Sequence, residues 1–335
     1  MKVLVVNQEQ VEELLSVKEC ILAMENTLRM LAMGDAILPQ RTHMLLADRQ
    51  SILGLMPSYL QGIKSVGVKV ITVFPANIGT EYDSHQGVVL LFDARRGLLR
   101  AIVDASAVTA IRTAAVSGVA TQLLARPDAH DLAIIGAGTQ ARSHLEAMLG
   151  VREIRRVRLF SLPRDQAICF AARESHRHGI NVEVMDSAEA AVRGADIICT
   201  VTTSKEPVVL GTWVAPGTHI NAVGACSPTD RELDTELVAK SRLYADRREA
   251  MLTEAGEFLI PRKEEVISDD HILGELGEVI VGRAAGRTAL DQITIFKSLG
   301  IAIEDLAAAH LVLTRAQQSR IGVWIEMGGR HLGSD

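Results

Sequence analysis

One short segment constrains the fold of this chain more than any other. Residues 132–135 form an apolar run typical of a buried strand, and residues 139–149 have the apolar spacing of a helix. Between them, Gly136, Gly138 and Ala141 form the pattern G-x-G-x-x-A. The first glycine permits a tight turn, the second lets the backbone approach a pyrophosphate, and the alanine permits close helix–strand packing. The segment therefore predicts a dinucleotide-binding unit.

The stretch that follows continues the alternation of strands and helices. Strands are predicted at residues 156–160, 182–185, 196–201, 219–223, 242–245 and 293–296, and helices at 139–149, 166–178 and 188–193. Such alternation implies right-handed βαβ units and a parallel sheet. We therefore expect an α/β fold that contains a Rossmann-type dinucleotide domain.

The region before this domain has a different pattern. A helix is predicted at residues 11–32, strands at 52–56, 67–74 and 87–92, and an Ala-rich helix at 108–124. A last helix, at residues 301–318, is a candidate to return and pack on this sheet-rich region. A length of 335 residues agrees with about two domains.

Composition narrows the classes of function. The net charge is −6 and no basic run is present, so no nucleic-acid partner is expected. The four cysteines are scattered without metal-ligand spacing, which predicts reduced thiols and no metal site. The apolar run at the N-terminus is too short for a signal peptide, and no stretch approaches about 18 uncharged apolar residues. We therefore expect a cytoplasmic protein without a membrane partner.

The end of the second strand bears on the choice of cofactor. The helix begins at Thr139 and Gln140, where backbone amides and the helix dipole favour the phosphates of a dinucleotide. Where an acid normally binds the ribose hydroxyls, this chain has Ser161, followed by Arg164. Arginine pairs with phosphate, so NADP(H) is favoured over NAD(H). If Arg164 is a solvated loop residue, the adjacent Asp165 leaves NAD(H) as the alternative.

Seven stretches spread over most of the chain carry a family resemblance. They are LGLMP at 53–57, VKVIT at 68–72, HQG at 85–87, TAIRTAA at 109–115, GAGTQ at 136–140, NAVG at 221–224 and FKSLG at 296–300. The chain resembles the ornithine cyclodeaminase/μ-crystallin family, in which these motifs occur in the same order. The family includes ornithine cyclodeaminases, alanine dehydrogenases and ketimine reductases.

The resemblance implies a division into two domains. A discontinuous α+β substrate and dimerisation domain would comprise residues 1–124 and 301–335, and the dinucleotide domain residues 125–300. A homodimer is implied in the same way. Further cofactor contacts are expected from Thr80, Val223 and Ser298.

Three basic residues are the leading candidates for substrate binding. Lys69 lies in an otherwise apolar strand, where a lysine is costly to bury unless paired and titrates easily. Arg112 has small neighbours that leave its guanidinium room to reach a cleft and pair with a carboxylate. The alternatives are a lysine that snorkels to water and an ordinary surface arginine. The resemblance places the family's substrate lysine at Lys69 and its first substrate arginine at Arg41.

Two carboxylates of the cyclodeaminases are missing from this chain. The resemblance aligns their aspartate with Cys226 and their glutamate with Gly54. Acid–base catalysis of that type therefore lacks its obvious residues, although Asp230 lies nearby in sequence as a substitute. Cys226 has no base beside it in sequence and is interpreted as a pocket-wall residue. His85 is a candidate proton relay, with an ordinary turn histidine as the alternative.

These observations predict an NADP(H)-dependent reductase of α-imino acids, such as the cyclic ketimines Δ1-pyrroline-2-carboxylate and Δ1-piperideine-2-carboxylate. Gly54 and the missing ribose acid look more like the ketimine reductases of the family than like its cyclodeaminases. One alternative is an NAD-dependent ornithine cyclodeaminase or alanine dehydrogenase. The other is a dinucleotide-binding protein without turnover, against which the retained Lys69 and Arg112 argue.

Overall fold

The computed structural model describes residues 2–328. The chain divides into two compact units, Met1–Arg112 with Ile301–Asp335, and Thr113–Gly300. The division falls inside helix α3 (Ala105–Leu124), whereas the sequence placed it after residue 124. The later part of α3 bonds to the second unit, because the Asn221 side-chain amide donates a hydrogen bond to the Thr121 hydroxyl at 3.0 Å.

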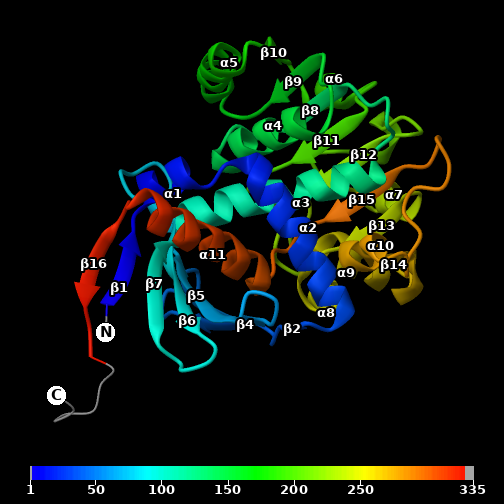
Figure 1. Ribbon diagram of the computed structural model, residues 1–335. Helices are drawn as coiled ribbons and strands as arrows, with labels where there is room; N and C mark the ends of the chain where they lie inside the picture. The colour runs from blue at the N-terminus through cyan, green and yellow to red at the C-terminus, as the bar shows by residue number, and fades with distance from the viewer. Residues whose placement is uncertain (1, 329–335) are drawn as a thin grey trace. The chain divides into compact units, whose positions relative to one another are not determined.

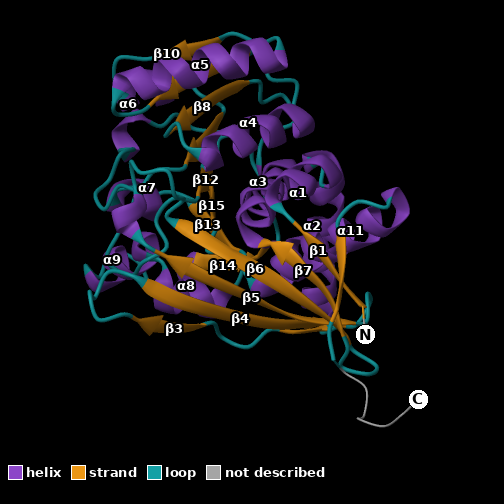
Figure 2. Ribbon diagram, turned by 90° about the vertical axis from the view of Figure 1, so that its left-hand side faces the viewer, coloured by secondary structure: helices purple, strands orange, loops and turns teal. Residues whose placement is uncertain are grey.

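The first unit is built on an eight-stranded sheet. Its strands are β1 (Lys2–Val6), β2 (Ala36–Ile37), β3 (Thr42–Leu45), β4 (Ile52–Leu60), β5 (Ser65–Val73), β6 (His85–Asp93), β7 (Leu99–Asp104) and β16 (Val323–Glu326). The order is β16-β1-β7-β6-β5-β4-β2, with β3 also paired to β4. Strands β4 to β7 pair antiparallel in sequence order and lie side by side in Figure 2. The three strands predicted here are β4, β5 and β6.

Three helices belong wholly to the first unit. They are α1 (Gln8–Leu14), α2 (Val17–Met33) and α11 (Ala302–Ser319). The single helix predicted over residues 11–32 is interrupted at Ser16, whose hydroxyl accepts a hydrogen bond from the Glu19 amide and caps α2. Helix α11 packs along α2 and over β4 and β5 (Figure 1). The last helix therefore returns to the first region, as expected.

The second unit contains an eight-stranded sheet whose paired strands are all parallel. Its strands are β8 (Asp131–Ile135), β9 (Arg156–Phe160), β10 (Val182–Val184), β11 (Ile197–Thr200), β12 (His219–Ala222), β13 (Arg242–Ala245), β14 (Ile272–Glu275) and β15 (Thr294–Lys297). The order is β10-β9-β8-β11-β12-β15-β13-β14. The strand order changes direction between β8 and β11, which is where such sheets bind ligands. The predicted Rossmann-type sheet is confirmed.

The helices of the second unit connect these strands. They are α4 (Thr139–Val151), α5 (Arg164–His178), α6 (Ala188–Val192), α7 (Thr235–Ala239), α8 (Arg248–Glu254), α9 (Gly256–Lys263) and α10 (Leu276–Ile280). Short 3-10 turns occupy Pro75–Asn77 in the first unit and Gly211–Trp213 and Asp269–His271 in the second. Helices α7 to α10 were not predicted, because such short elements show too little periodicity to identify.

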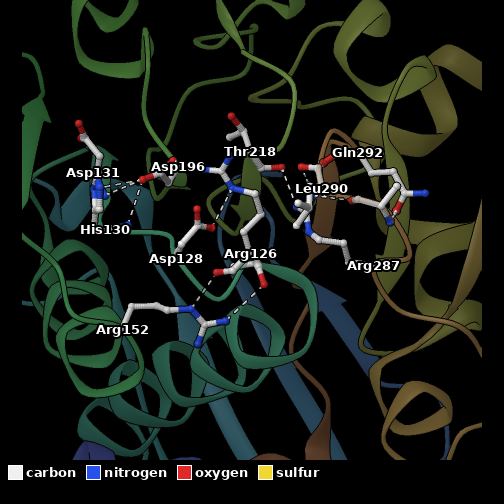
Figure 3. A network of polar contacts seen from close by, with 12 residues as sticks. Arg126, Asp128, His130, Asp131, Arg152, Asp196, Thr218, Arg287, Leu290 and Gln292 are labelled. Atoms are coloured by element: carbon white, nitrogen blue, oxygen red, sulfur yellow. Dashed lines mark hydrogen bonds and ion pairs between the residues drawn. The ribbon is translucent and has the colours of Figure 1, made fainter.

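Arginine side chains bind the backbone carbonyls at the C-terminal end of α3 (Figure 3). Arg152 donates to the carbonyl oxygen of Thr121 at 2.8 Å and to that of Arg126 at 3.3 Å. The Arg126 guanidinium pairs in turn with Asp196. Cations at this end satisfy carbonyls that lack helical partners and oppose the helix dipole.

Helix α3 is also the most apolar long helix of the described chain. By length and composition alone it could cross a membrane. However, 78% of its most apolar window is buried inside the protein. This burial is typical of a core helix, and it explains why Ala and other small residues dominate the segment.

Candidate active site and dinucleotide site

Lys69 lies in the middle of β5 and is 2% exposed. Its ammonium nitrogen is 2.9 Å from Oδ2 of Asp305 on α11 and 3.4 Å from the Thr109 hydroxyl on α3. The lysine therefore does not snorkel to water. A buried ammonium is tolerated here because a carboxylate accompanies it.

Arg112 on α3 joins the same cluster and is 4% exposed. Its Nε donates to Oδ1 of Asp305 at 2.9 Å, and its Nη1 donates to Oε2 of Glu304 at 2.6 Å. The alternative of a surface arginine is excluded. Asp305 bridges the two cations, since one of its oxygens faces Arg112 and the other faces Lys69.

The cluster changes the proton affinity of its members. Burial lowers the pKa of Lys69 to about 8, although the Asp305 charge opposes this. Burial alone would raise the pKa of Asp305, but the charges of Arg112 and Lys69 hold it below its ordinary value. Lys69 is therefore mostly protonated at neutral pH and close to titration, as a proton-transferring group needs to be.

The remaining candidate residues of the first unit are His85, Arg41 and Thr80. His85, at the start of β6, has its pKa lowered to about 4 by burial and then by Lys69 and Arg112. It is therefore a neutral ring at physiological pH. Arg41 precedes β3, and its charge contributes to the lowered pKa of Lys69. Thr80 lies in the exposed loop after β5, where its hydroxyl bonds to the Asn77 carbonyl at 2.8 Å.

Sequence reasoning missed Glu304 and Asp305. Both are fully buried in the first turn of α11, where Glu304 also accepts a hydrogen bond from the Ile301 amide at 3.2 Å. Two adjacent acids inside an otherwise apolar helix were the available signal. Charged residues of this kind are rarely buried unless they are paired.

The glycine turn after β8 has the conformation that the motif predicts. Gly136 has φ +115° and its amide donates to the Phe160 carbonyl at 2.8 Å. A Cβ atom on Gly136 would lie 2.7 Å from the carbonyl oxygen of Val201. Gly138 is the N-cap of α4, and a Cβ atom there would meet nothing within 4 Å. The first glycine serves the turn, and the second leaves open space at a helix N-terminus.

The start of α4 fits a dinucleotide in two further respects. Ala141 is fully buried against the sheet, while Thr139 is exposed at the first position of the helix. The side-chain oxygen of Gln140 is buried without a hydrogen-bond partner. Buried polar atoms are normally paired, so an orphaned one beside an open glycine turn is the pattern of a site that awaits a ligand.

The remaining predicted cofactor residues lie at the carboxyl ends of parallel strands. Ser161 follows β9, Val223 follows β12 and Ser298 follows β15. The Ser298 amide donates to the Ala222 carbonyl at 3.0 Å, which ties the last two together. Arg164 is half exposed at the first position of α5 and pairs with Asp186 at 2.8 Å. All of these residues belong to the second unit.

Gly54 and Cys226 occupy the two positions at which the resemblance places the acids of the cyclodeaminases. Gly54 lies on β4, where a Cβ atom would be 3.1 Å from the Ile71 side chain. Cys226 lies in the loop after β12, and its thiol donates to the Val223 carbonyl at 3.6 Å. Asp230 is in the same connection and accepts from the Thr229 hydroxyl at 3.1 Å. Among residues 2–328, no group of three or more His, Cys, Asp or Glu side chains is arranged to hold a metal ion.

The two glycines of the turn are expected to respond differently to alanine. Gly136→Ala should lower the free energy of unfolding by about 1–3 kcal/mol, because φ is positive and the backbone of Val201 is too close. Gly138→Ala should change stability by less than about 0.5 kcal/mol but weaken dinucleotide binding, since the methyl group enters the space a pyrophosphate approaches. Urea denaturation and cofactor titration measure the two effects. Unchanged cofactor affinity in Gly138→Ala would contradict this assignment of the turn.

A parallel sheet of this order, with an open glycine turn at a helix N-terminus, defines a protein with a dinucleotide-binding domain. The profile of the ornithine cyclodeaminase/mu-crystallin family matches residues 1–320, and the chain belongs to that family. It is 43% identical to the ketimine reductase mu-crystallin of Mus musculus over 279 residues, which cover 83% of this chain and 85% of the relative.

Solved structures agree with this assignment. Δ1-pyrroline-2-carboxylate reductase of Thermococcus litoralis, in complex with NADH and L-proline, superposes with a TM-score of 0.93 at 39% identity, over 96% of this chain and 99% of that one. An archaeal alanine dehydrogenase dimer with bound NAD superposes with a TM-score of 0.92 at 33% identity, over 98% and 100% of the two chains.

Proposed function

We propose that the protein is an NAD(P)H-dependent reductase that converts α-imino acids into L-amino acids. Cyclic ketimines such as Δ1-pyrroline-2-carboxylate and Δ1-piperideine-2-carboxylate are the proposed substrates. The observation that carries the proposal is the buried cluster of Lys69, Arg112 and Asp305, in a chain similar to ketimine and pyrroline-2-carboxylate reductases. With Arg41, whose charge acts on Lys69, the cluster has more cations than acids, which suits a substrate that carries a carboxylate beside its reacting nitrogen.

The residues of the cluster have distinct proposed roles. Arg41 would hold the substrate carboxylate, because a guanidinium group pairs with it bidentately, and Arg112, held in place by Glu304 and Asp305, would add positive charge beside it. Lys69 would supply the proton for the imine nitrogen, since its pKa of about 8 leaves it charged at neutral pH. A reduced nicotinamide supplies a hydride when bound, and a protonated imine accepts hydride more readily because the developing lone pair is already neutralised.

The direct test is oxidation of NADPH and NADH by the purified protein with each of the two cyclic ketimines. Turnover that depends on the imino acid is the expected result. L-alanine with the oxidised cofactors tests the alanine dehydrogenase alternative, and ammonia release from L-ornithine tests the cyclodeaminase alternative. Gly54 and Cys226, in place of the two acids, disfavour the latter. Cofactor binding without turnover on any of these substrates would replace the proposal with a non-catalytic binding protein.

A preference for NADP(H) is part of the proposal. It is supported by Ser161 in place of an acid after β9 and by Arg164 at the start of α5. The Asp186 carboxylate now pairs with Arg164 and would have to give way to a 2′-phosphate. The two solved relatives described above contain NADH and NAD, so both cofactors belong in every assay.

Replacing Arg164 with alanine is therefore expected to weaken NADPH binding about tenfold and to leave NADH binding unchanged. Arg177→Ala on the same helix, which removes a pair with Glu146, serves as the control. Fluorescence titration of the two reduced cofactors gives both dissociation constants. An equal effect on NADPH and NADH, or none on either, would show that Arg164 does not select the cofactor.

We also propose a cytoplasmic homodimer. The sheet face of the first unit away from α11 is apolar and only partly buried. Its residues are Leu55, Pro57, Tyr59, Val66, Val68, Val70, Val88, Leu90, Phe92 and Ile102. Contiguous apolar surface of this kind marks interaction sites, and a second copy is the proposed occupant because one solved relative is a dimer. All four cysteines are free thiols, which supports a reducing compartment.

A further inference from the structure

One buried carboxylate in the second unit joins two loops that are separate in sequence. Glu232 is fully buried, and its Oε1 accepts hydrogen bonds from the amide and the hydroxyl of Thr202, both at 2.7 Å. Its Oε2 accepts from the Thr200 hydroxyl at 2.8 Å and from the Gly224 amide at 2.7 Å. Thr200 and Thr202 lead out of β11, and Gly224 leads out of β12. Both oxygens of the carboxylate are therefore fully used.

A second buried pair holds Glu232 in place. The Glu232 amide donates to Oε1 of Glu257 at 3.0 Å. Oε2 of Glu257 lies 3.2 Å from the ammonium nitrogen of Lys297, and both side chains are fully buried. Lys297, at the end of β15, also donates to the Ala225 carbonyl. The Lys297 ammonium therefore offsets the charges of Glu232 and Glu257. Through Ala225 it also contacts the loop after β12, which Glu232 contacts at Gly224.

The two loops are packed too closely for any residue but glycine at one point. A Cβ atom on Gly224 would lie 2.1 Å from the Thr202 carbonyl oxygen and 2.6 Å from Oε1 of Glu232. Neither neighbour can move freely, because one is backbone and the other accepts two hydrogen bonds. The loops after β11 and β12 are therefore held in close contact at this edge of the sheet.

These loops lie where a parallel sheet binds its ligand. Strands β8, β11, β12 and β15 are consecutive neighbours in the sheet, and the switch in strand order lies between β8 and β11. Gly136 packs against the carbonyl of Val201, within the loop that Glu232 holds. Val223 and Ser298, both predicted cofactor contacts, directly adjoin Gly224 and Lys297. No sequence motif pointed to Glu232, Glu257 or Lys297 as a group.

We propose that Glu232 is a positioning residue for the cofactor. By holding the loops after β11 and β12 together, it shapes the part of the sheet edge that receives the nicotinamide half of the dinucleotide, beyond the glycine turn and on the opposite side of the switch in strand order from β9. This inference rests on the dinucleotide function proposed above. It predicts that Glu232 affects the two halves of the cofactor unequally, which a residue needed only for folding would not do.

The test compares cofactor fragments by calorimetry. Glu232→Gln places an amide group against hydrogen-bond donors, so it should weaken NADH and NADPH binding at least about tenfold. Binding of ADP-ribose, which lacks the nicotinamide, should change by less than about twofold if only the nicotinamide side is disturbed. Glu236→Gln, which alters an exposed carboxylate on α7, should leave all three affinities unchanged.

Three outcomes would overturn the proposal. Equal weakening of ADP-ribose and NADH would reduce Glu232 to a general structural role, and unchanged NADH affinity would remove any role in binding. Failure of the wild-type protein to bind NADH, NADPH and ADP-ribose alike would refute the dinucleotide function itself, so the two failures are distinguishable. If Glu232→Gln does not fold, Thr202→Val removes one of the same hydrogen bonds and should show the same unequal effect, about threefold in NADH affinity.

Discussion

Replacing Lys69 with methionine is expected to lower kcat for imino-acid reduction by between about 100- and 10,000-fold, the range contributed by a positioned proton donor. Methionine has a similar length and suits the apolar strand, so the loss reflects the ammonium group and not a cavity. Cofactor affinity, measured by fluorescence titration, should stay at the wild-type value because the dinucleotide turn belongs to the other unit. Lys18→Met, which alters an exposed lysine of α2, is the matched control.

The pH dependence of the wild-type rate provides a second check. The pKa of Lys69 is lowered to about 8, chiefly by burial, so the ammonium form predominates below that pH and is lost above it. Turnover should therefore decline as the pH rises through 8. The residual rate of Lys69→Met should lack this decline. A wild-type rate that stays constant well above that pH would contradict the proton-donor role of Lys69.

Asp305→Asn is expected to lower the free energy of unfolding by about 3–5 kcal/mol, because it leaves Lys69 and Arg112 buried without the carboxylate that bridges them. The folded state holds the pKa of Asp305 below its ordinary value, so its contribution is complete above the unfolded pKa and is lost as the pH falls through the folded one. Urea denaturation at neutral pH measures the loss.

Asp83→Asn, at an exposed carboxylate of the same unit, provides the comparison for Asp305→Asn. Its unfolding free energy should lie within about 0.5 kcal/mol of the wild type. If the two variants proved equally stable, the bridging role of Asp305 would have to be abandoned. In any folded Asp305→Asn protein, the alkaline decline in rate should move to lower pH, because the Asp305 charge raises the pKa of Lys69.

The parts of this fold that could be predicted from sequence are those specified by neighbouring residues. The unit from β8 to α4 is an example, since an apolar strand, a glycine turn and a helix follow one another without interruption. The helices α7 to α10, of five to eight residues, were missed because so short a segment provides less than two or three periods of helical pattern.

The candidate site was predictable only in part, for a related reason. Lys69 and Arg112 were identified because each is unusual among its sequence neighbours. Their partners Glu304 and Asp305 lie almost two hundred positions or more along the chain, and no local pattern connects them. Glu232 was missed in the same way, because its importance arises from loops that meet only when parallel strands are assembled.

The discontinuity of the first unit has a consequence for biosynthesis. A ribosome delivers β5 and the start of α3 early, together with their buried lysine and arginine, while α11 emerges only after the whole parallel-sheet unit. Domains tend to fold as units during synthesis, so the nucleotide-binding unit is free to fold while the nascent first unit still lacks the acids that neutralise its core. Lys69 and Arg112 therefore remain without Glu304 and Asp305 until the last helix arrives, and we expect completion of the candidate substrate site to be among the final steps in making the molecule.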